Sequence, residues 1–349
     1  MRSRTCILAL VCLVGLTALG GGLALAGRPR PPAAVDFVFL KEGKLSVTDV
    51  SGSSVVAISN SNDDDQPAWS PDGQWIAYTV EVPAGSFYRD LYRVRPDGTG
   101  RELLMSYRQG GAYPPPKPLT PLSWLPDGRR ILYSTQYTAP YTAEETRVLS
   151  VLDVQTRAVS FVYLPGLDPD HLTPPSSATA SPDRAPATPG YQGWLAFASF
   201  GLTYDAREIE VIRLEDDATG NLVTVGSRIA LTRSAAQDSP AWSRDGLHLA
   251  FVDRALGAEG KDLCTVDFDP AAGTFGTPQV LYSNANSLPD GNVWFGLSWD
   301  PTGSWVAFSL RLASGGMGDL VRVATITQYQ TPTAILTSRR FEGRPDWQP

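Results

Sequence analysis

Apolar residues occur along this chain in short runs that either stay apolar or alternate with polar residues. Residues 76–80 (Ile-Ala-Tyr-Thr-Val) and 249–252 (Leu-Ala-Phe-Val) are examples, and each run comes shortly after an Asp-Gly pair. Such runs, bounded by turn residues, are typical of β-strands. The 32 glycines and 29 prolines among 349 residues favour many short elements over long helices. The pattern therefore predicts an all-β chain.

One motif organises the chain. A strand ends at a tryptophan, a turn with Asp and Gly follows, and an apolar strand comes next, at residues 66–78, 122–133, 239–251 and 297–308. The glycine tolerates the positive φ of a tight turn, so each copy predicts a β-hairpin. A degenerate copy begins at Ala180, without the tryptophan, and a truncated copy closes the chain at residues 344–349.

The copies are evenly spaced. Intervals of 55, 56, 62, 57 and 48 residues separate Trp69, Trp124, Ala180, Trp242, Trp299 and Trp347. A third strand, seen as Asp-Leu-Tyr-Arg-Val at residues 90–94, and a fourth complete each unit. Repeated units of four antiparallel strands predict the blades of a β-propeller, here six of them.

The two ends of the chain carry complementary parts of one unit. The last copy stops after its first strand, whereas residues 35–40 and 45–50 supply two strands that no copy of the motif precedes. We expect the N-terminal strands to pair with the C-terminal strand, because closure removes two exposed sheet edges.

These residues carry a resemblance to a known family. The string Pro-x-Trp-Ser-Pro-Asp-Gly at residues 67–73, then Ile-Ala-Tyr and Asp-Leu-Tyr, resembles the WD40-like (PD40) repeat of TolB-like six-bladed β-propellers. The resemblance covers nearly everything after residue 34. Related propellers serve as periplasmic scaffolds, as gating domains of prolyl peptidases and as exported proteins without an assigned role, so it implies the fold rather than the function. This chain departs from the family in the lost third tryptophan, in the proline-rich stretch 165–189 and in lacking a second domain.

The N-terminal sequence has the pattern of a targeting segment. Arg2 and Arg4 precede an apolar run, and small residues at 20–26 suit signal peptidase. We therefore expect a signal peptide at residues 1–26, a linker at 27–34 and the propeller at 35–349. The alternative is an uncleaved anchor, since residues 7–26 are long enough to span a bilayer.

The net charge limits the classes of partner that we expect. The formal net charge is −7, and removing residues 1–26 takes away two arginines and no acid, which leaves about −9. This balance argues against nucleic acid and anionic membrane surfaces, so we expect membrane contact only through an uncleaved N-terminal segment. Cys264 alone would remain after cleavage, as a small core residue. We expect a monomer.

Strand parity separates two faces of the propeller. The turns between first and second strands, and between third and fourth strands, fall on one face, which we call face two. The other connections, including those between blades, fall on the opposite face, face one, and they are longer. Binding residues on rigid β-scaffolds are commonly found in such loops.

The loops between blades lead into the innermost strands, so their last residues are expected to ring the mouth of a central channel on face one. An acidic arc facing basic residues would suit a polar ligand, a cation or a peptide terminus. The alternative is that the acids form turns and hold the loops through bonds to backbone N–H groups. The candidate ligand-binding residues are Asp63, Asp64, Asp65, Asp238, Asp290, Asn292, Arg340, Glu342 and Arg344.

No cofactor is required by the motifs. Calcium is kept as a candidate because Asp63, Asp64, Asp65 and Asp290 could supply oxygen ligands, although their spacing matches no EF-hand loop. The chain has two histidines, His171 and His248, and we find no nucleophile elbow with a downstream histidine, no Walker loop and no cysteine pair. We therefore assign no catalytic residue.

The sequence thus predicts an exported, extracytoplasmic propeller that acts as a non-catalytic scaffold. Its location would be periplasmic, secreted or on the cell surface, and a protein, peptide or glycan would bind its long-loop face. Two alternatives remain open: a propeller hydrolase or lactonase that uses a channel-bound cation, and a membrane-tethered sensor or complex subunit.

Overall fold

The computed structural model of the 349-residue chain separates a compact unit, Pro31–Pro349, from Met1–Arg30. The expected signal peptide, the linker and most of the proline-rich stretch 165–189 lie outside the residues that the structure describes. No helix among the described residues is both long and apolar enough to cross a membrane. The described residues are 35–82, 88–106, 117–118, 122–138, 145–164, 178–180, 190–200, 207–231, 237–253, 262–283, 292–311, 319–325, 331–337 and 342–349.

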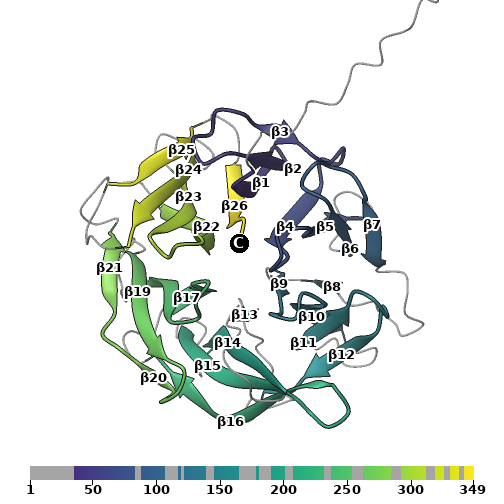
Figure 1. Cartoon of the computed structure of the whole chain (residues 1–349), viewed down its shortest axis with the longest axis vertical. Helices are drawn as coiled ribbons and strands as arrows, with labels where there is room; N and C mark the ends of the chain where they lie inside the picture. The colour runs from purple at the N-terminus through teal and green to yellow at the C-terminus, as the bar shows by residue number, and fades with distance from the viewer. Residues whose placement is uncertain are drawn as a thin grey trace, which may run out of the picture. The chain divides into compact units, whose positions relative to one another are not determined.

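The unit Pro31–Pro349 consists of six antiparallel sheets arranged in a ring, as expected (Figure 1). We number the sheets as blades in chain order. Blades 1 to 3 contain β4 (Asp64–Trp69), β5 (Ile76–Glu81), β6 (Arg89–Val94) and β7 (Glu102–Met105); β8 (Lys117–Pro118), β9 (Ser123–Trp124), β10 (Arg130–Thr138), β11 (Glu145–Asp153) and β12 (Val159–Val162); and β13 (Ala178–Ala180), β14 (Tyr191–Phe200), β15 (Arg207–Asp216) and β16 (Leu222–Ala230).

Blades 4 and 5 follow the same plan, and blade 6 combines both ends of the chain. They contain β17 (Gln237–Trp242), β18 (His248–Asp253), β19 (Asp262–Asp269), β20 (Thr274–Phe275) and β21 (Gln279–Tyr282); β22 (Asn292–Trp299), β23 (Trp305–Arg311), β24 (Asp319–Ala324) and β25 (Thr333–Leu336); and β26 (Glu342–Trp347), β1 (Phe37–Lys41), β2 (Lys44–Thr48) and β3 (Val56–Ala57).

The predicted closure of the ring is confirmed. β26 pairs antiparallel with β1, so that Phe37 faces Trp347 and Val38 faces Asp346. The backbone N–H of Gln348 extends the pairing with a 2.7 Å bond to the carbonyl of Asp36. The C-terminus lies close to the ring axis in Figure 1. Both ends of the chain are therefore held in one sheet.

In blades 1 and 4, the hairpin after the innermost strand is fixed by its own side chains. In blade 1, Oδ1 of Asp72 accepts bonds from Ser70 Oγ at 2.6 Å and from the N–H of Gln74 at 3.0 Å. Gly73 has a φ of 66°, as the turn requires. Ser243 and Asp245 repeat these contacts in blade 4. The motif residues thus explain why the chain reverses at these points.

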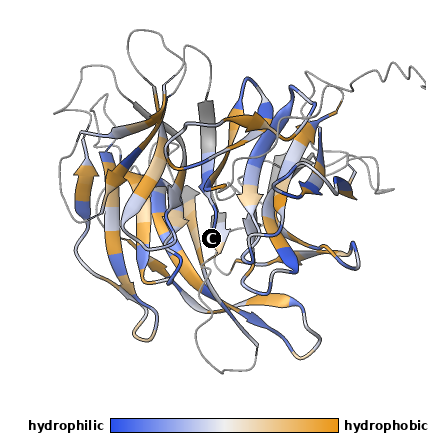
Figure 2. Cartoon of the chain, turned by 45° about the horizontal axis from the view of Figure 1, so that its top comes forward, coloured by the Kyte–Doolittle hydropathy of each residue, from blue (hydrophilic) through white to orange (hydrophobic). Residues whose placement is uncertain are grey.

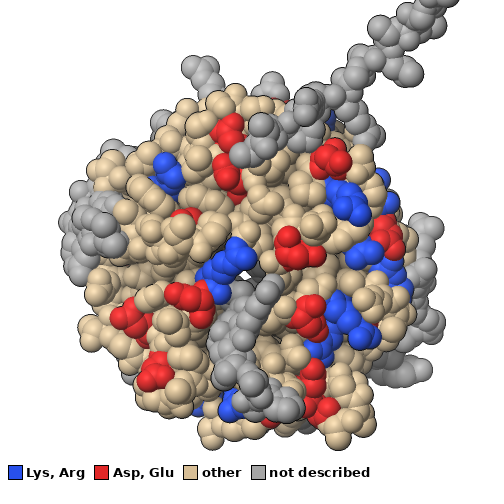
Figure 3. Space-filling model, in the orientation of Figure 1, with Lys and Arg blue, Asp and Glu red and all other residues tan. Residues whose placement is uncertain are grey.

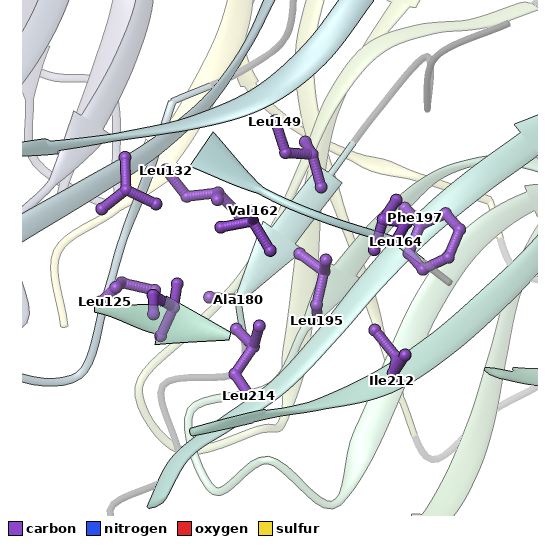
Figure 4. Close-up of a cluster of buried hydrophobic side chains, with 12 residues drawn as sticks. Leu125, Leu132, Leu149, Val162, Leu164, Ala180, Leu195, Phe197, Ile212 and Leu214 are labelled. Atoms are coloured by element: carbon purple, nitrogen blue, oxygen red, sulfur yellow. The ribbon is translucent and has the colours of Figure 1, made fainter. Parts of the chain in front are cut away.

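The core is divided into six clusters, one between each pair of adjacent blades. The repeat tryptophans Trp69, Trp124, Trp242, Trp299 and Trp347 each lie in the cluster that joins their blade to the preceding one. Apolar residues alternate with polar ones along the strands in Figure 2. Figure 4 shows the cluster between blades 2 and 3, where Leu132 and Leu149 meet Leu195 and Leu214. Cys264 is 1% exposed, in the cluster between blades 3 and 4.

Candidate functional site

Four consecutive innermost strands carry the residues predicted to line the channel mouth. Asp64, Asn292 and Glu342 are the first residues of β4, β22 and β26, and Asp238 is the second residue of β17. Innermost strands of a propeller run in the same sense, so these starting points share face one. Asp290 and Arg340 lie outside the described residues, as do the side chains of Asn292, Glu342 and Arg344.

The Asp64 side chain is committed to the contact between blades. It is 4% exposed, and its Oδ2 accepts bonds from the N–H of Leu45 at 2.9 Å and from the hydroxyl of Ser59. Leu45 belongs to β2, the third strand of blade 6. Burial raises the pKa of the Asp64 carboxyl, and the bonds from Ser59 and Leu45 oppose that rise. Asp64 therefore joins blade 1 to blade 6.

Blade 4 uses the equivalent position in the same way. Gln237, the first residue of β17, is fully buried, and its Oε1 accepts a 3.2 Å bond from the N–H of Ile209. Ile209 lies in β15, the third strand of blade 3. A buried acceptor at the start of an innermost strand thus satisfies a backbone donor of the preceding blade, whether that acceptor is a carboxylate or an amide.

The next acids stabilise bulges in the innermost strands. Asp65 accepts a 2.9 Å bond from the N–H of Gln66, and Asp238 accepts a 2.7 Å bond from the N–H of Ser239. Gln66 and Ser239 have φ values of 52° and 55°, which few residues other than glycine adopt. Asp65 also forms an ion pair with Arg89, at the start of β6. These carboxylates therefore support the backbone at the rim.

Asp63 differs from its neighbours because its backbone bonds to Ser61 and Glu81. Its N–H donates to Ser61 Oγ at 3.0 Å, and its carbonyl accepts from the N–H of Glu81 at 3.0 Å. Among the described residues, no group of three or more His, Cys, Asp or Glu side chains is placed to hold a metal ion.

Sequence reasoning did not identify Asp346, whose side chain contributes to the closure of the ring. In blades 2 and 5, the side chain before the repeat position bonds to the next innermost strand: Ser123 Oγ accepts from the N–H of Ala180 at 3.0 Å, and Ser298 Oγ accepts from the N–H of Trp347 at 2.8 Å. Asp346 holds this position in blade 6 and accepts from the N–H of Trp69 at 2.6 Å. The alignment of repeats could have revealed it, because the other blades have Ala, Ser or Thr there.

Asp346 also bonds to the blade on its other side. Its Oδ1 accepts a 3.0 Å bond from the hydroxyl of Ser298, and its carbonyl accepts a 3.2 Å bond from the indole N–H of Trp69. Burial raises the pKa of the Asp346 carboxyl to about 6, against the opposing effect of the bonds from Trp69, Ser298 and Trp347. One titratable group thus links blades 5, 6 and 1.

Comparison with known proteins supports the assignment of the fold. No family model matches the chain, and no curated protein matches it. TolB from Acinetobacter baumannii superposes with a TM-score of 0.59 at 19% identity, over 90% of this chain and 66% of the TolB chain. The fold is that of a TolB-like six-bladed β-propeller. The predicted family resemblance is therefore confirmed in its architecture.

Other solved propellers resemble this TolB-like chain less closely. A putative 6-phosphogluconolactonase from Bacteroides uniformis superposes with a TM-score of 0.49 at 12% identity, over 90% of this chain and 99% of that one. An oligogalacturonate lyase from Vibrio parahaemolyticus gives a TM-score of 0.48 at 12% identity, over 87% of this chain and 79% of that one. The TolB-like propeller spans slightly less than two thirds of the TolB chain itself.

Proposed function

We propose that this TolB-like propeller is a non-catalytic scaffold that binds a protein, peptide or glycan through face one. The observation that carries the proposal is the use of acceptors at the channel mouth. Asp64 and Gln237 hold adjacent blades together, and Asp65 and Asp238 hold bulges at the start of innermost strands. A fixed rim of this kind positions the connections that leave it, which is what a binding surface built from loops needs.

The distribution of connections supports face one as the binding side. Three of the four longest separations between consecutive strands join one blade to the next, and strand parity assigns them to face one: β7 to β8, β12 to β13 and β21 to β22. The fourth, β13 to β14, is the first-to-second connection of blade 3. In blade 1, the first-to-second turn on face two is short, with a backbone bond between Ser70 and Trp75. On the side of the ring drawn in Figure 3, acidic and basic side chains are interspersed, and neither charge forms a continuous surface there.

We further propose that the protein works outside the cytoplasm. Arg2, Arg4 and the apolar run that follows them support export, and the absence of any expected disulfide is compatible with it because the ring closes on itself through β26 and β1. Mass spectrometry of protein from the membrane-free extracytoplasmic fraction tests this. A first residue of Gly27 would agree with a cleaved signal, whereas an intact N-terminus in the membrane fraction would favour the tethered sensor.

Site-directed photo-crosslinking tests which face binds. Asn62 and Arg244 are both exposed, and they lie in connections on face one and face two. A benzophenone amino acid at residue 62 should yield a discrete adduct in cells, and the same group at residue 244 should yield none. Adducts only from residue 244 would overturn the assignment of face one.

The competing function is a hydrolase or lactonase with a cation in the channel. It requires several oxygens to converge on one ion, at about 2.3–2.6 Å for calcium. Thermal melting with calcium and with a chelator separates the two functions. A scaffold should give superimposable curves. A calcium-dependent rise that disappears when Asp63, Asp64 and Asp65 are replaced by Asn would favour the enzyme, provided that the variant remains folded.

A further inference from the structure

A second surface, distinct from face one, lies on the outer rim where blades 1 and 2 meet, and it begins at the third-to-fourth turns of these blades on face two. We define this rim surface by Arg93, Arg95, Arg157, Val159, Phe161 and Tyr163. Val159, Phe161 and Tyr163 alternate along β12 and just beyond it, and they are 39%, 58% and 67% exposed. They supply three of the seven large apolar side chains that are exposed among the described residues.

The direction of this apolar row follows from its neighbours. Val162 and Leu164 are buried in the cluster between blades 2 and 3, together with Leu195. Successive side chains on a strand point to opposite sides, so Phe161 and Tyr163 point toward the side of blade 1. The row is also held in place, because Thr224 Oγ1 of blade 3 donates a 2.8 Å bond to the carbonyl of Tyr163. The position of the apolar row is therefore fixed without a partner.

Blade 1 contributes basic groups on the same side. Trp75 packs against the cluster between blades 1 and 2, and the guanidinium groups of Arg93 and Arg95 lie over its ring at 4.2 and 4.7 Å from the centroid. Glu102 pairs with Arg93 at 2.7 Å and also with Arg157. Because Arg157 precedes Val159 by two residues, this ion network reaches the apolar row.

The local charge is opposite to that of the whole chain. Arg93 and Arg157 share Glu102, and Arg95 lies beside them with Asp97 in its own turn, so three arginines face two acids here, whereas the chain carries a formal net charge of −7. Arg95 is exposed, and stacking on Trp75 restricts its guanidinium while leaving N–H donors at the edge. Arg157 has a φ of 64°, a conformation that glycine adopts more readily.

We propose that the rim surface docks an acidic segment of a protein partner that also carries apolar side chains. Carboxylates would pair with Arg95 and its neighbours, since a guanidinium fork matches a carboxylate. Apolar side chains of an extended segment would contact Val159, Phe161 and Tyr163, because alternate residues of two extended chains share the same spacing. The proposal goes beyond binding at face one, and either can fail without the other.

A peptide-selection experiment tests the proposal. The full-length protein is panned against a phage-displayed random peptide library, and the enriched sequences are compared with those enriched by a Phe161→Ser/Tyr163→Ser variant. The wild type should enrich peptides that combine Asp or Glu with aromatic or aliphatic residues. A synthetic peptide of that sequence should bind at least tenfold more weakly to the double variant and to Arg95→Glu, and more weakly in high salt.

Val225→Ser is the matched control, because Val225 is a comparably exposed residue, at 40%, on the outer strand β16. It should leave peptide affinity unchanged, and circular dichroism should show all variants folded. Three outcomes would overturn the proposal: no enrichment, enriched peptides without acidic residues, or affinities that the double variant and Arg95→Glu leave unaltered. Retention on phosphatidylserine vesicles that depends on Arg95 and Phe161, without peptide binding, would assign the surface to a membrane instead.

Discussion

The backbone N–H of Trp69 donates a 2.6 Å hydrogen bond to Oδ2 of Asp346, a residue 277 positions away in the sequence. This bond joins the blade that begins after the N-terminal strands to the last strand of the chain. Its acceptor is a carboxylate where other blades use a serine hydroxyl, as Ser298 does toward Trp347. The closure of the ring therefore includes a group that can gain or lose a proton.

The position of Asp346 predicts a dependence of stability on pH. Its ordinary pKa of 3.8 applies to the unfolded chain, and burial raises the pKa to about 6 in the folded protein. Between these values the folded protein retains a proton that the unfolded chain has released, so a rise in pH destabilises the fold. The contribution of Asp346 to the free energy of unfolding should fall by about 2 kcal/mol from pH 4 to pH 6.5.

Asp346→Asn isolates this effect, because asparagine resembles the protonated form and can still accept a bond from Trp69. Urea unfolding, followed by tryptophan fluorescence, should give similar stabilities for wild type and variant at pH 4. The variant should be more stable by about 2 kcal/mol at pH 7. A constant difference across this pH range would show that Asp346 does not titrate as described.

The indole groups of Trp299 and Trp242 offer a comparison between two blade junctions. Trp299 Nε1 donates a 3.0 Å bond to the carbonyl of Ala241, whereas Trp242 Nε1 is buried without a bonding partner in the described part of the chain. Their exposures are 7% and 6%. Trp299→Phe should therefore destabilise the fold by about 1–2 kcal/mol more than Trp242→Phe, because it leaves a buried carbonyl unsatisfied.

Chemical unfolding at one pH tests this difference. If Trp299→Phe and Trp242→Phe lower the free energy of unfolding equally, the hydrogen bond of Trp299 does not contribute as described. Blade 3, which has Ala180 in place of the repeat tryptophan, differs from the other blades in its indole hydrogen bonds. Ala180 has no indole to offer to blade 2, and the indole of Trp242 finds no acceptor in blade 3. Both junctions of blade 3 thus lack the indole bond that Trp124 makes with Ala68 at 3.1 Å.

An ion pair spans the junction between blades 2 and 3. Arg130 binds Asp216 through two nitrogens, at 2.5 and 3.1 Å, and also binds Asp127 at 2.6 Å. The Arg130 side chain is 11% exposed. Arg130→Met should destabilise the fold by about 2–3 kcal/mol, because it leaves half-buried carboxylates short of a charged donor.

Arg129→Met is the control for this substitution. Arg129 forms a 2.5 Å ion pair with Asp153, yet its side chain is 48% exposed. Its loss should destabilise the fold much less than the loss of Arg130, because solvent already screens the pair. Melting temperatures of the two variants that fall by the same amount would show that the Arg130 network contributes no more than a surface pair.

The six blades and their closure could be predicted because they depend on local signals. Each hairpin needs a turn that Asp and Gly specify within a few residues, and Trp69 and its equivalents mark a spacing that survives divergence of the other positions. Counting strands in each unit shows that the N-terminal strands supply those that the last copy of the motif lacks. These features need no knowledge of which side chains meet across the ring.

The roles of the acids could not be derived in the same way. Asp64 and Asp65 are adjacent and chemically identical, yet one is buried against Leu45 of blade 6 and the other pairs with Arg89 of its own blade. The difference arises from the side of the strand that each occupies and from the bulge at Gln66. Asp346 was overlooked because its bonds to Trp69 and Ser298 connect residues that the sequence separates widely.

The tight turn between β1 and β2 provides a test of how blade 6 packs on the loop that leads to Asp64. Gly43 has a φ of 75°, and a Cβ placed on it would lie 1.9 Å from the carbonyl oxygen of Asn62. Gly128 has a similar φ of 65° in the turn of blade 2, and nothing lies within 4 Å of such a Cβ. Both glycines carry the backbone cost of substitution, but only Gly43 adds a steric clash with the backbone.

Gly128→Ala should therefore cost about 1 kcal/mol, from the left-handed conformation alone. Gly43→Ala should cost at least about 2 kcal/mol more, because the turn or the loop must move. Since the N–H of Asp64 bonds to the Gly43 carbonyl at 2.9 Å, movement here should also loosen the start of β4. Hydrogen exchange at Asp64 should accelerate in the Gly43 variant and stay unchanged in the Gly128 variant. Equal costs and equal exchange in the two variants would contradict the contact with Asn62.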